Sequence, residues 1–397
     1  MNLALDLRAC QFPQYATRGI GSYSKHLANA ILAHGTNDRY TVFGYQGIKD
    51  FLGTTRTADR SMIEVFGGMP MLVNQRTFPY RKRFESAYFD RLSKKHGIDV
   101  VLSFLSGDGQ VKVDAGKDRA LVRVFYDLIP LLYSEQYLPD EQGKRTYSDN
   151  LKEFERSDAI ITISERSKKD LLDHIDFDGD KVTVIYPGIG SEHLLDEKPG
   201  DTDLSAYGIH HDFLLYVGGY DFRKNVESII EAFARQEQDI RRNLQLVLVG
   251  EIGRPQKDTL MRLAKRRSVE SAVVFTGFVP DVDLGRLYRQ AEALVYPSLY
   301  EGFGLTVLEA MANGCPVITS NNSSLGEVAK DYALTFDPEN VDEITAAMRR
   351  IITDGTLREN LRTKARGYAA TYSWERTARE TVELLRSTAA KKGTGNA

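Results

Sequence analysis

Short apolar runs alternate with longer amphipathic segments along most of the 397-residue chain. In the first half, the runs that predict buried strands are 3–7, 40–45, 100–104, 120–125, 159–163 and 182–185. In the second half they are 213–217, 245–249, 273–276, 293–296, 316–319 and 333–336. Strands that are apolar throughout and alternate with helices are typical of parallel sheets covered on both faces. The pattern predicts an α/β protein with two doubly wound, Rossmann-like domains facing across a cleft.

A change of composition near the middle divides this pattern. The segment from Tyr186 to His210 is rich in proline, glycine and acidic residues, which is typical of a linker. A chain of this length is also too long for one common core. We therefore expect a first domain over residues 1–190 and a second over residues 205–373. Residues 391–397 are expected to form a frayed tail.

Composition and charge exclude several classes of function. The net charge is -3, so no overall field favours nucleic acid. The two cysteines, Cys10 and Cys315, lie in apolar, strand-like contexts and are expected to be reduced core residues. No apolar run is long enough to span a bilayer, and the chain starts directly with a strand rather than with a signal-peptide pattern. We therefore expect a cytoplasmic protein.

Residues 74–97 form a basic and aromatic segment in which only Glu85 and Asp90 oppose the positive charge. One interpretation is peripheral docking at the inner face of the membrane, on anionic lipid headgroups or on a phosphorylated lipid acceptor. The other is a helix whose charged face is solvated and whose aromatic residues belong to the core. The sequence leaves both interpretations open.

The stretch from Tyr296 to Gly314 contains a strand, a glycine-rich turn and a helix that begins near Leu305. The free N–H groups and the dipole of a helix start favour an anion, and Gly302 and Gly304 allow the backbone to approach a phosphate closely. The stretch therefore predicts a phosphate site. Its alternative is an ordinary α/β unit without a ligand.

Two acids flank this predicted phosphate site. Glu301 lies in the turn and Glu309 lies one to two turns inside the helix, and both are suitable acceptors for sugar hydroxyls. We expect Leu305, Leu308 and Ala312 to face the sheet, which would direct Glu309 away from it.

A second loop places two cations after a strand. Gly218 and Gly219 permit a tight turn, and Arg223 and Lys224 follow at the start of a helix. Because cations oppose the dipole at a helix start, this placement needs a reason. A diphosphate leaving group supplies one, since charge builds on its oxygen as the bond breaks. The alternative is a pair of solvated charges.

The first half offers weaker candidates. Gly19 and Gly21 resemble part of a dinucleotide fingerprint, but its third glycine is absent, so we expect only a helix start with free amides. Asp127 follows the end of a strand, where open α/β sheets bind ligands, and is either a site residue or a helix cap. His26 is expected on a helix surface rather than in catalysis.

The acid pairs of the chain do not indicate a metal site. Asp281-Val-Asp283 and Asp176-Phe-Asp178 have the spacing found in metal-dependent sugar transferases, but each is expected to be solvated in a polar loop. No cluster of histidines and cysteines accompanies them. We expect neither a metal nor a cofactor.

Residues 180–375 closely resemble glycosyltransferase family 4, the retaining nucleotide-sugar transferases of the GT-B fold. The matching motifs agree in order and separation: Gly218-Gly-Tyr-Asp-Phe-Arg-Lys-Asn, Gly277-Phe-Val, Glu301-Gly-Phe-Gly-Leu with Glu309, and Ser324-Leu-Gly-Glu327-Val. The first half matches less sharply, through Gly19-Ile-Gly21 and Ile161-Thr-Ile-Ser-Glu165.

The resemblance implies a role for each donor-site residue. Arg223 and Lys224 would hold the donor diphosphate, with backbone amides near Gly304 and Leu305. Glu309 would bind the ribose hydroxyls. The first domain would bind the acceptor, and a final helix over 374–390 would cross back to pack on it.

Further implied roles concern the sugar and the base. Glu301 would contact sugar hydroxyls near the anomeric carbon, and Phe278 and Val279 would border the base. Where the family often has a His-Asp pair, this chain has Tyr126-Asp127. Asp127 is therefore the acid that survives at that position.

The resemblance thus implies a metal-independent hexosyltransferase that retains anomeric configuration. It is similar to bacterial mannosyltransferases of surface-polysaccharide and O-antigen assembly, which implies GDP-mannose as donor and a glycan or lipid-linked glycan as acceptor. A nucleotide-sugar epimerase or hydrolase of the same fold and a non-catalytic sugar-nucleotide binding protein remain alternatives. The candidate catalytic residues are Glu301, Arg223, Lys224 and Asp127. The candidate donor-binding residues are Gly218, Gly219, Phe278, Val279, Gly304, Leu305, Glu309, Gly19 and Gly21.

Overall fold

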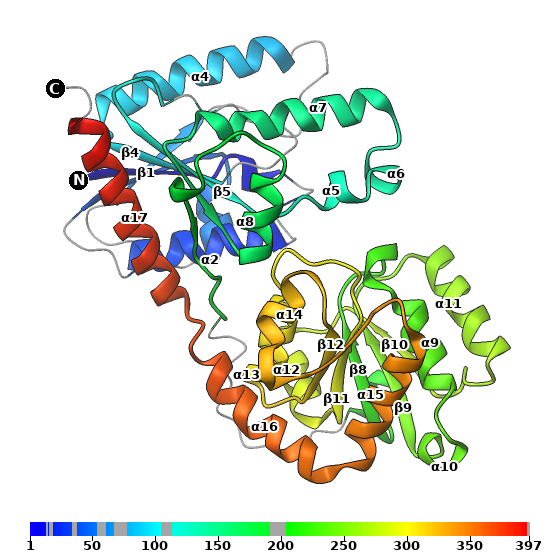
Figure 1. The fold of residues 1–397 in the computed structure, drawn as a ribbon. Coiled ribbons are helices and arrows are strands. Elements are labelled where there is room, and N and C mark those ends of the chain that lie inside the picture. The colour runs from blue at the N-terminus through cyan, green and yellow to red at the C-terminus, as the bar shows by residue number, and fades with distance from the viewer. Residues whose placement is uncertain are drawn as a thin grey trace. The chain divides into compact units, whose positions relative to one another are not determined.

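The structure is a computed structural model that describes residues 1–12, 15, 19–33, 38–53, 61–66, 78–104, 113, 115–190 and 204–394, with side chains for all of these except 61–66 and 78–85. The chain forms two compact units (Figure 1). The first comprises Met1–Gly188 with Ser373–Ala397, and the second comprises Ile189–Tyr372. Most of the predicted linker, residues 191–203, lies outside the described residues.

The first unit contains a seven-stranded sheet in the order β3-β2-β1-β4-β5-β6-β7, and every pairing is parallel. The strands are β1 (Asn2–Asp6), β2 (Arg39–Tyr45), β3 (Ser61–Phe66), β4 (Val100–Ser103), β5 (Ala120–Phe125), β6 (Ala159–Thr162) and β7 (Val182–Val184). The sequence did not predict β3, because Ser61 and Glu64 interrupt its apolar run. It is an edge strand, which is paired on one side only and is under less pressure to be apolar throughout.

Helices and buried side chains complete the first unit. The helices are α2 (Gly19–Ala33), α3 (Ile48–Leu52), α4 (Phe78–Lys95), α5 (Ile129–Leu132), α6 (Ser134–Tyr137), α7 (Glu141–Leu151) and α8 (Glu165–Leu172). Phe43 of β2 and Phe89 of α4 pack in one core cluster with ring centroids 4.7 Å apart. Next to them, the Arg8 guanidinium lies over the Phe89 ring and donates two hydrogen bonds, of 2.8 and 2.9 Å, to the Asp6 carboxylate. This ion pair is almost fully buried.

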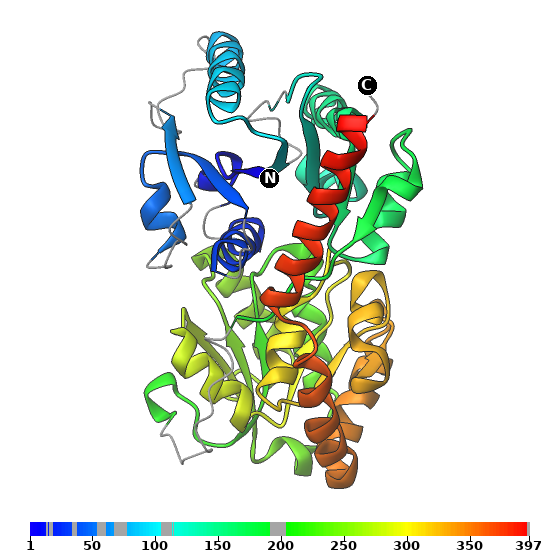
Figure 2. The same ribbon diagram turned by 90° about the vertical axis from the view of Figure 1, so that its left-hand side faces the viewer.

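The C-terminal helix, α17 (Trp374–Thr394), also belongs to the first unit (Figure 2). It packs on α2, β4 and β5, and its Lys392 ammonium lies 2.7 Å from the Asp158 carboxylate. The expected frayed tail is therefore wrong for residues 391–394, because this ion pair holds the last turn; residues 395–397 lie outside the described residues. At its other end the backbone passes so close to Gly188 that a Cβ there would lie 2.0 Å from the Trp374 nitrogen.

The second unit contains a six-stranded parallel sheet in the order β10-β9-β8-β11-β12-β13. The strands are β8 (Asp212–Val217), β9 (Leu244–Val249), β10 (Val273–Gly277), β11 (Ala293–Tyr296), β12 (Val317–Ser320) and β13 (Leu334–Phe336). The helices are α9 (Val226–Ala234), α10 (Gln238–Arg241), α11 (Arg254–Arg266), α12 (Asp281–Gln290), α13 (Leu305–Ala312), α14 (Ser323–Ala329), α15 (Val341–Thr353) and α16 (Gly355–Ala369). The predicted doubly wound α/β class is confirmed.

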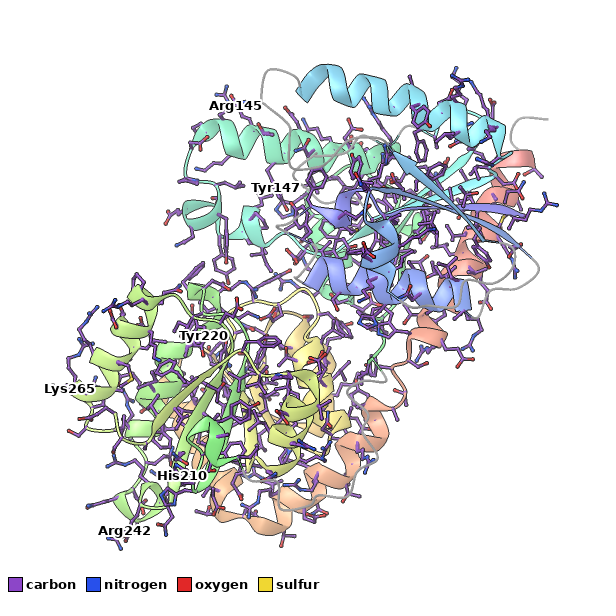
Figure 3. All side chains as sticks on the ribbon, turned by 180° about the vertical axis from the view of Figure 1, so that it is seen from behind. Arg145, Tyr147, His210, Tyr220, Arg242 and Lys265 are labelled. Atoms are coloured by element: carbon purple, nitrogen blue, oxygen red, sulfur yellow. The ribbon has the colours of Figure 1, made fainter. Side chains whose placement is uncertain are left out.

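The order of the strands in the second sheet reverses between β8 and β11. From β8 the chain moves outward to β9 and β10, and it then returns to place β11 on the other side of β8. Ligands of open α/β sheets bind beyond the carboxyl ends of the strands at such a switch point. Figure 3 labels Tyr220 at this end of the sheet and His210 and Arg242, which precede strands, at the opposite end.

Both cysteines are buried and free. Burial raises the pKa of the Cys10 and Cys315 thiols to about 12. The expectation that both are core residues is confirmed, and in the structure neither forms a disulfide.

Candidate active site

The loops that follow β8 and β11 bring two cations and one carboxylate together at the switch point. The Lys224 ammonium donates a hydrogen bond of 2.6 Å to Glu301 Oε1. The Arg223 guanidinium lies 2.9 Å from Glu301 Oε2 and also donates to the Tyr300 carbonyl. A further acid, Asp221, lies 3.3 Å from Arg223 Nε and is more exposed. The sequence proposed these cations and Glu301 as separate contacts to a donor, whereas the structure pairs them with one another.

Tyr296, the last residue of β11, also belongs to this cluster. Its hydroxyl accepts a hydrogen bond of 2.7 Å from the Lys224 ammonium and donates one of 3.1 Å to Glu301 Oε1. The Tyr296 ring is 2% exposed and stacks on the ring of Tyr216 in the neighbouring strand β8. Sequence reasoning treated Tyr296 only as the end of a strand.

The charges of the cluster stabilise one another. Burial favours the neutral form of Glu301, yet the positive charges of Lys224 and Arg223 outweigh it and lower the pKa of the carboxyl to about 2. Burial alone would lower the pKa of the Lys224 ammonium, but the charge of Glu301 raises it above its usual value. All three groups are therefore charged at neutral pH.

Side chains from β12 and α14 hold the backbone of the Glu301 loop. Ser320 and Asn322 donate to the carbonyls of Ser298 and Leu299, at 2.8 and 2.9 Å. The buried Ser324 hydroxyl lies 2.8 Å from the Glu301 carbonyl and 2.7 Å from that of Phe303. The motif around Ser324 was recognised in the sequence, but its contact with the Glu301 loop was not.

The start of α13 departs in one detail from what the sequence predicted. Gly304 precedes the helix with φ of 114°, and a Cβ there would lie 2.8 Å from Leu325 Cδ2. Leu305 is only half-buried, which contradicts its expected place against the sheet; it is the first residue of the helix and lies beyond the ends of the strands. Leu308 and Ala312 are buried as expected, and Val307 is buried as well. The amides at Gly304 and Leu305 remain candidate phosphate donors.

Glu309, the second acid of the predicted pair, is half-buried. Its carboxylate lies near the buried hydroxyl of Tyr288. Burial, and then the negative charge of Glu309, raise the pKa of that phenol. Glu309 belongs to α13, whereas Glu301 lies in the loop before that helix. Its predicted contact with ribose stays a prediction.

A pocket of about 700 Å³ lies where β9 and β10 end. Phe278 is 70% exposed and lines this pocket, whereas its neighbour Val279 is buried. Glu251 and Lys257 also line it, and the Lys257 ammonium lies 5.4 Å from the centre of the Phe275 ring. Neither Glu251 nor Lys257 was predicted from the sequence. Glu251 follows the end of β9 almost directly, and this position beyond a strand end could have identified it as a candidate.

The glycines of the β8 loop allow neighbouring backbones to meet. Gly218 adopts φ of 153° and its amide donates to the Val249 carbonyl at 3.0 Å. A Cβ on Gly250 would lie 2.1 Å from the Gly218 carbonyl oxygen. The next glycine, Gly219, accepts a hydrogen bond from Tyr216.

The candidates of the first unit have structural partners. Helix α2 begins at Gly19, as expected, and Gly21 is buried in its first turn. The Asp127 carboxylate accepts a 2.9 Å hydrogen bond from the amide of Ile129, so it caps the turn into α5. The His26 ring stacks on Trp374 of α17, with centroids 5.4 Å apart. A role for Gly19, Gly21 or Asp127 in binding stays a prediction.

Tyr126, at the position where the family often has histidine, is turned into the first unit. It is 7% exposed, and its hydroxyl lies 2.9 Å from the hydroxyl of Ser24. Ser24 in turn accepts a hydrogen bond from the Cys10 thiol. This phenol is therefore a buried structural group in the first unit.

The predicted basic segment is only partly described. Residues 74–77 and the side chains of 78–85 lie outside the described residues. In the remainder of α4, Phe89 is fully buried, Tyr88 packs against the core, and Asp90 pairs with Lys94 and Arg119. These contacts favour the interpretation of a helix with core aromatic residues. Within the described ranges, no helix combines the length and the apolar character that crossing a membrane requires.

Of the two acid pairs with metal-like spacing, Asp176 and Asp178 are exposed in a loop, as expected, whereas Asp281 and Asp283 are not in a loop. Asp281 and Asp283 begin α12, where acids interact favourably with the helix dipole, and Asp283 accepts a hydrogen bond of 2.7 Å from Tyr207. Asp178 caps a short 3₁₀ turn. Within the described part of the chain, no three His, Cys, Asp or Glu side chains are grouped to hold a metal ion.

Comparisons with known proteins identify the family. Residues 209–368 match the family model described as glycosyl transferases group 1, and residues 17–193 match the model described as glycosyltransferase family 4. The O-antigen chain mannosyltransferase B of Escherichia coli is 30% identical over 268 residues, which cover 67% of this chain and 70% of that protein. The chain belongs to glycosyltransferase family 4.

Two further similarities define how far the family relationship extends. The serotype-specific mannosyltransferase WbdA of Escherichia coli is 34% identical over 400 aligned positions, which cover 96% of the family 4 chain described here but only 48% of WbdA. The chain thus spans about half the length of that relative. The structure of a sucrose-phosphate synthase from Thermosynechococcus elongatus superimposes with a TM-score of 0.73 at 20% identity, covering 98% of this chain and all of the other. The fold is therefore that of the GT-B glycosyltransferases.

Proposed function

We propose that this chain is a retaining glycosyltransferase that moves mannose from GDP-mannose to a glycan or lipid-linked glycan during surface-polysaccharide synthesis. The observation that carries the proposal is the cluster of Arg223, Lys224 and Glu301 at the switch point of the second sheet. Two cations fixed by a buried carboxylate are suited to a leaving group that gains negative charge. The related mannosyltransferases supply the choice of sugar.

In the proposed reaction the donor diphosphate lies against Arg223, Lys224 and the amides at the start of α13. The bond between the anomeric carbon and the diphosphate breaks, and both bonding electrons go to the phosphate oxygen. The acceptor hydroxyl attacks on the same face, and its proton passes to that departing oxygen. Glu301 then has two tasks, to orient the cations and to accept a sugar hydroxyl. None of these steps requires a metal ion.

The pocket beside Phe278 supports guanine as the base. Guanine presents its N1–H and its N2 amine side by side, and a carboxylate such as that of Glu251 can accept from both with its two oxygens. Uracil presents only one N–H. The exposed Phe278 ring offers a face on which a base can stack.

We further propose that the first unit binds the acceptor and that the protein works at the cytoplasmic face of the membrane. The acceptor assignment rests on the location of the cation cluster in the second unit. Peripheral membrane contact through residues 74–97 is part of this proposal. Mixing the purified protein with anionic vesicles and measuring co-sedimentation tests it; equal recovery with neutral vesicles contradicts it.

The main test is a donor panel with purified protein. GDP-mannose, GDP-fucose, UDP-glucose and UDP-galactose are each offered with a mannose-terminated lipid-linked acceptor, and products are identified by mass spectrometry and by NMR of the anomeric centre. Transfer from GDP-mannose with retention is expected. Transfer only from a UDP-sugar contradicts the donor, and inverted product contradicts the mechanism. Release of altered or free sugar without acceptor indicates an epimerase or hydrolase.

A paired substitution tests the role of the cations. In Arg223→Ala with Lys224→Ala, we expect turnover to fall at least about 100-fold, while donor affinity falls much less, because charge on the leaving oxygen is greatest in the transition state. Arg241→Ala with Arg242→Ala is the matched control, since Arg242 lies at the other end of the sheet (Figure 3) and Arg241 directly precedes it at the end of α10. Unchanged turnover in the first variant contradicts the proposal.

A further inference from the structure

Lys224 has a defined set of partners in the cluster. An ammonium group carries three N–H donors in a tetrahedral arrangement. In the described part of the chain, two of them have acceptors: Glu301 Oε1 at 2.6 Å and the Tyr296 hydroxyl at 2.7 Å. With two directions fixed, the third donor can point in only one direction. A ligand phosphate that approaches the cluster can therefore accept from this third N–H group, whose direction is already fixed.

The Tyr296 hydroxyl is itself fixed by two hydrogen bonds. It accepts from Lys224 and donates to Glu301 Oε1 at 3.1 Å, so the nitrogen and the two oxygens form a closed triangle of hydrogen bonds. The ring that carries the hydroxyl is buried at the end of β11 and stacks on Tyr216. A hydroxyl on a rigid, packed ring fixes a flexible lysine side chain better than a second flexible group does.

Solvent does not replace this support. Lys224 is 8% exposed and Glu301 9% exposed, so few water molecules reach either group. Loss of the hydroxyl therefore leaves a buried N–H without its oxygen, and the ammonium can rotate about its long side chain. The charge remains in the site, but its direction is lost.

We propose that Tyr296 is a positioning residue, whose hydroxyl aims the Lys224 ammonium at the diphosphate of the donor. Tyr296 does not contact the reacting atoms; it acts through Lys224 and Glu301. The inference rests on the proposed function, since it assumes that a donor diphosphate is the ligand of Lys224.

The substitution Tyr296→Phe removes the hydroxyl and keeps the ring. We expect kcat for mannose transfer to fall about tenfold, which corresponds to one hydrogen bond in the transition state. The KM for the donor is expected to change less than about twofold, because the charge that attracts the diphosphate is still present. Tyr40→Phe, which removes the hydroxyl of a buried tyrosine in β2 of the first unit, is the matched control.

The pH profile separates positioning from general damage. The hydroxyl oxygen stabilises the charged form of Lys224, so its removal lowers the pKa of that ammonium. The alkaline limb of kcat/KM therefore moves to lower pH in Tyr296→Phe and stays in place in Tyr40→Phe. An unmoved alkaline limb contradicts the proposal.

A double-mutant cycle with Lys224→Met keeps the test valid if Tyr296→Phe folds poorly, because the double variant contains no buried ammonium in need of an oxygen. If Tyr296 acts through Lys224, adding Tyr296→Phe to Lys224→Met lowers kcat no further. Additive losses overturn the proposal. A wild-type protein that transfers nothing from any donor contradicts the proposed function instead, so the two failures are distinguishable.

Discussion

The substitution Glu301→Gln tests whether the buried charge cluster is held together as the structure indicates. Glutamine keeps the size of the side chain and its carbonyl oxygen but removes the negative charge that faces Lys224 and Arg223. Each of these cations has a side chain that is no more than 15% exposed. The variant therefore leaves two like charges close together with little water to screen them.

The magnitude follows from the pKa of Glu301. Its pKa falls from 4.5 to about 2 in the folded protein, and one pKa unit is worth about 1.4 kcal/mol, so the charged form of Glu301 stabilises the fold by about 3 kcal/mol. Because the folded pKa is the lower one, this stabilisation is complete above pH 4.5. It is lost as the pH falls from 4.5 toward 2. At pH 7 we expect Glu301→Gln to be less stable by about 3–5 kcal/mol, as for other broken buried ion pairs.

The assay must report on the second unit alone. The single tryptophan of the chain, Trp374, belongs to the first unit, so its fluorescence does not serve. Urea-dependent hydrogen exchange of peptides from β8 and β11 gives the free energy of unfolding of the second unit at pH 7, 5, 4 and 3, after correction for the intrinsic exchange rate. Glu270→Gln, which changes an exposed glutamate, is the control.

The expected result is a difference between wild type and Glu301→Gln that is large at pH 7 and shrinks below pH 4.5. A difference that is the same at every pH would refute the reasoning, because it would mean that the charge of Glu301 contributes nothing to stability. Loss of stability in Glu270→Gln would show that the assay measures something other than the cluster.

Three further outcomes follow from other parts of the structure. Asp6→Asn breaks the buried pair with Arg8 and should lower the stability of the first unit by about 3–5 kcal/mol in urea unfolding followed by Trp374 fluorescence; a loss below about 1 kcal/mol contradicts a strong pair. Phe278→Ala should weaken GDP binding in calorimetry about tenfold and leave the melting temperature almost unchanged, since the ring is mostly exposed, whereas unchanged affinity excludes it from the base pocket. Ser324→Ala removes a hydroxyl from the Glu301 loop and should lower kcat about tenfold with restored activity in Ser324→Thr; full activity in Ser324→Ala shows that the loop holds its shape without it.

Strand positions could be predicted from the sequence because strands of a sheet that is covered on both faces consist of short, continuous apolar runs. The predicted strands end within one residue of the observed ones throughout both sheets. Only β3 escaped, since an edge strand with Ser61 and Glu64 lacks such a run. The prediction for helix α17 began correctly at Trp374 but stopped four residues short of its observed end at Thr394. The last turn is held by the ion pair of Lys392 with Asp158, which lies 234 residues earlier and gives no local signal.

The candidate site was predicted as a set of residue types but not as an arrangement. Lys224 and Glu301 are separated by 77 residues, and only the neighbouring positions of β8 and β11 make them partners. The same holds for Ser324, whose hydroxyl meets a loop that precedes it by more than twenty residues. For Tyr126, the sequence showed only a departure from the histidine that the family often has, and its hydrogen bond with Ser24 in the core could not be predicted from that.

The membership of α17 in the first unit affects how the chain acquires its fold during synthesis. A ribosome completes residues 1–188 and then makes the whole second unit before Trp374 emerges. At about 5–20 residues per second this delay is on the order of 10–40 s. During that time the surface of α2, β4 and β5 that α17 covers has no partner from its own chain. The second unit is thus the first that can fold to completion, and the nascent first unit is the part that we expect chaperones to hold.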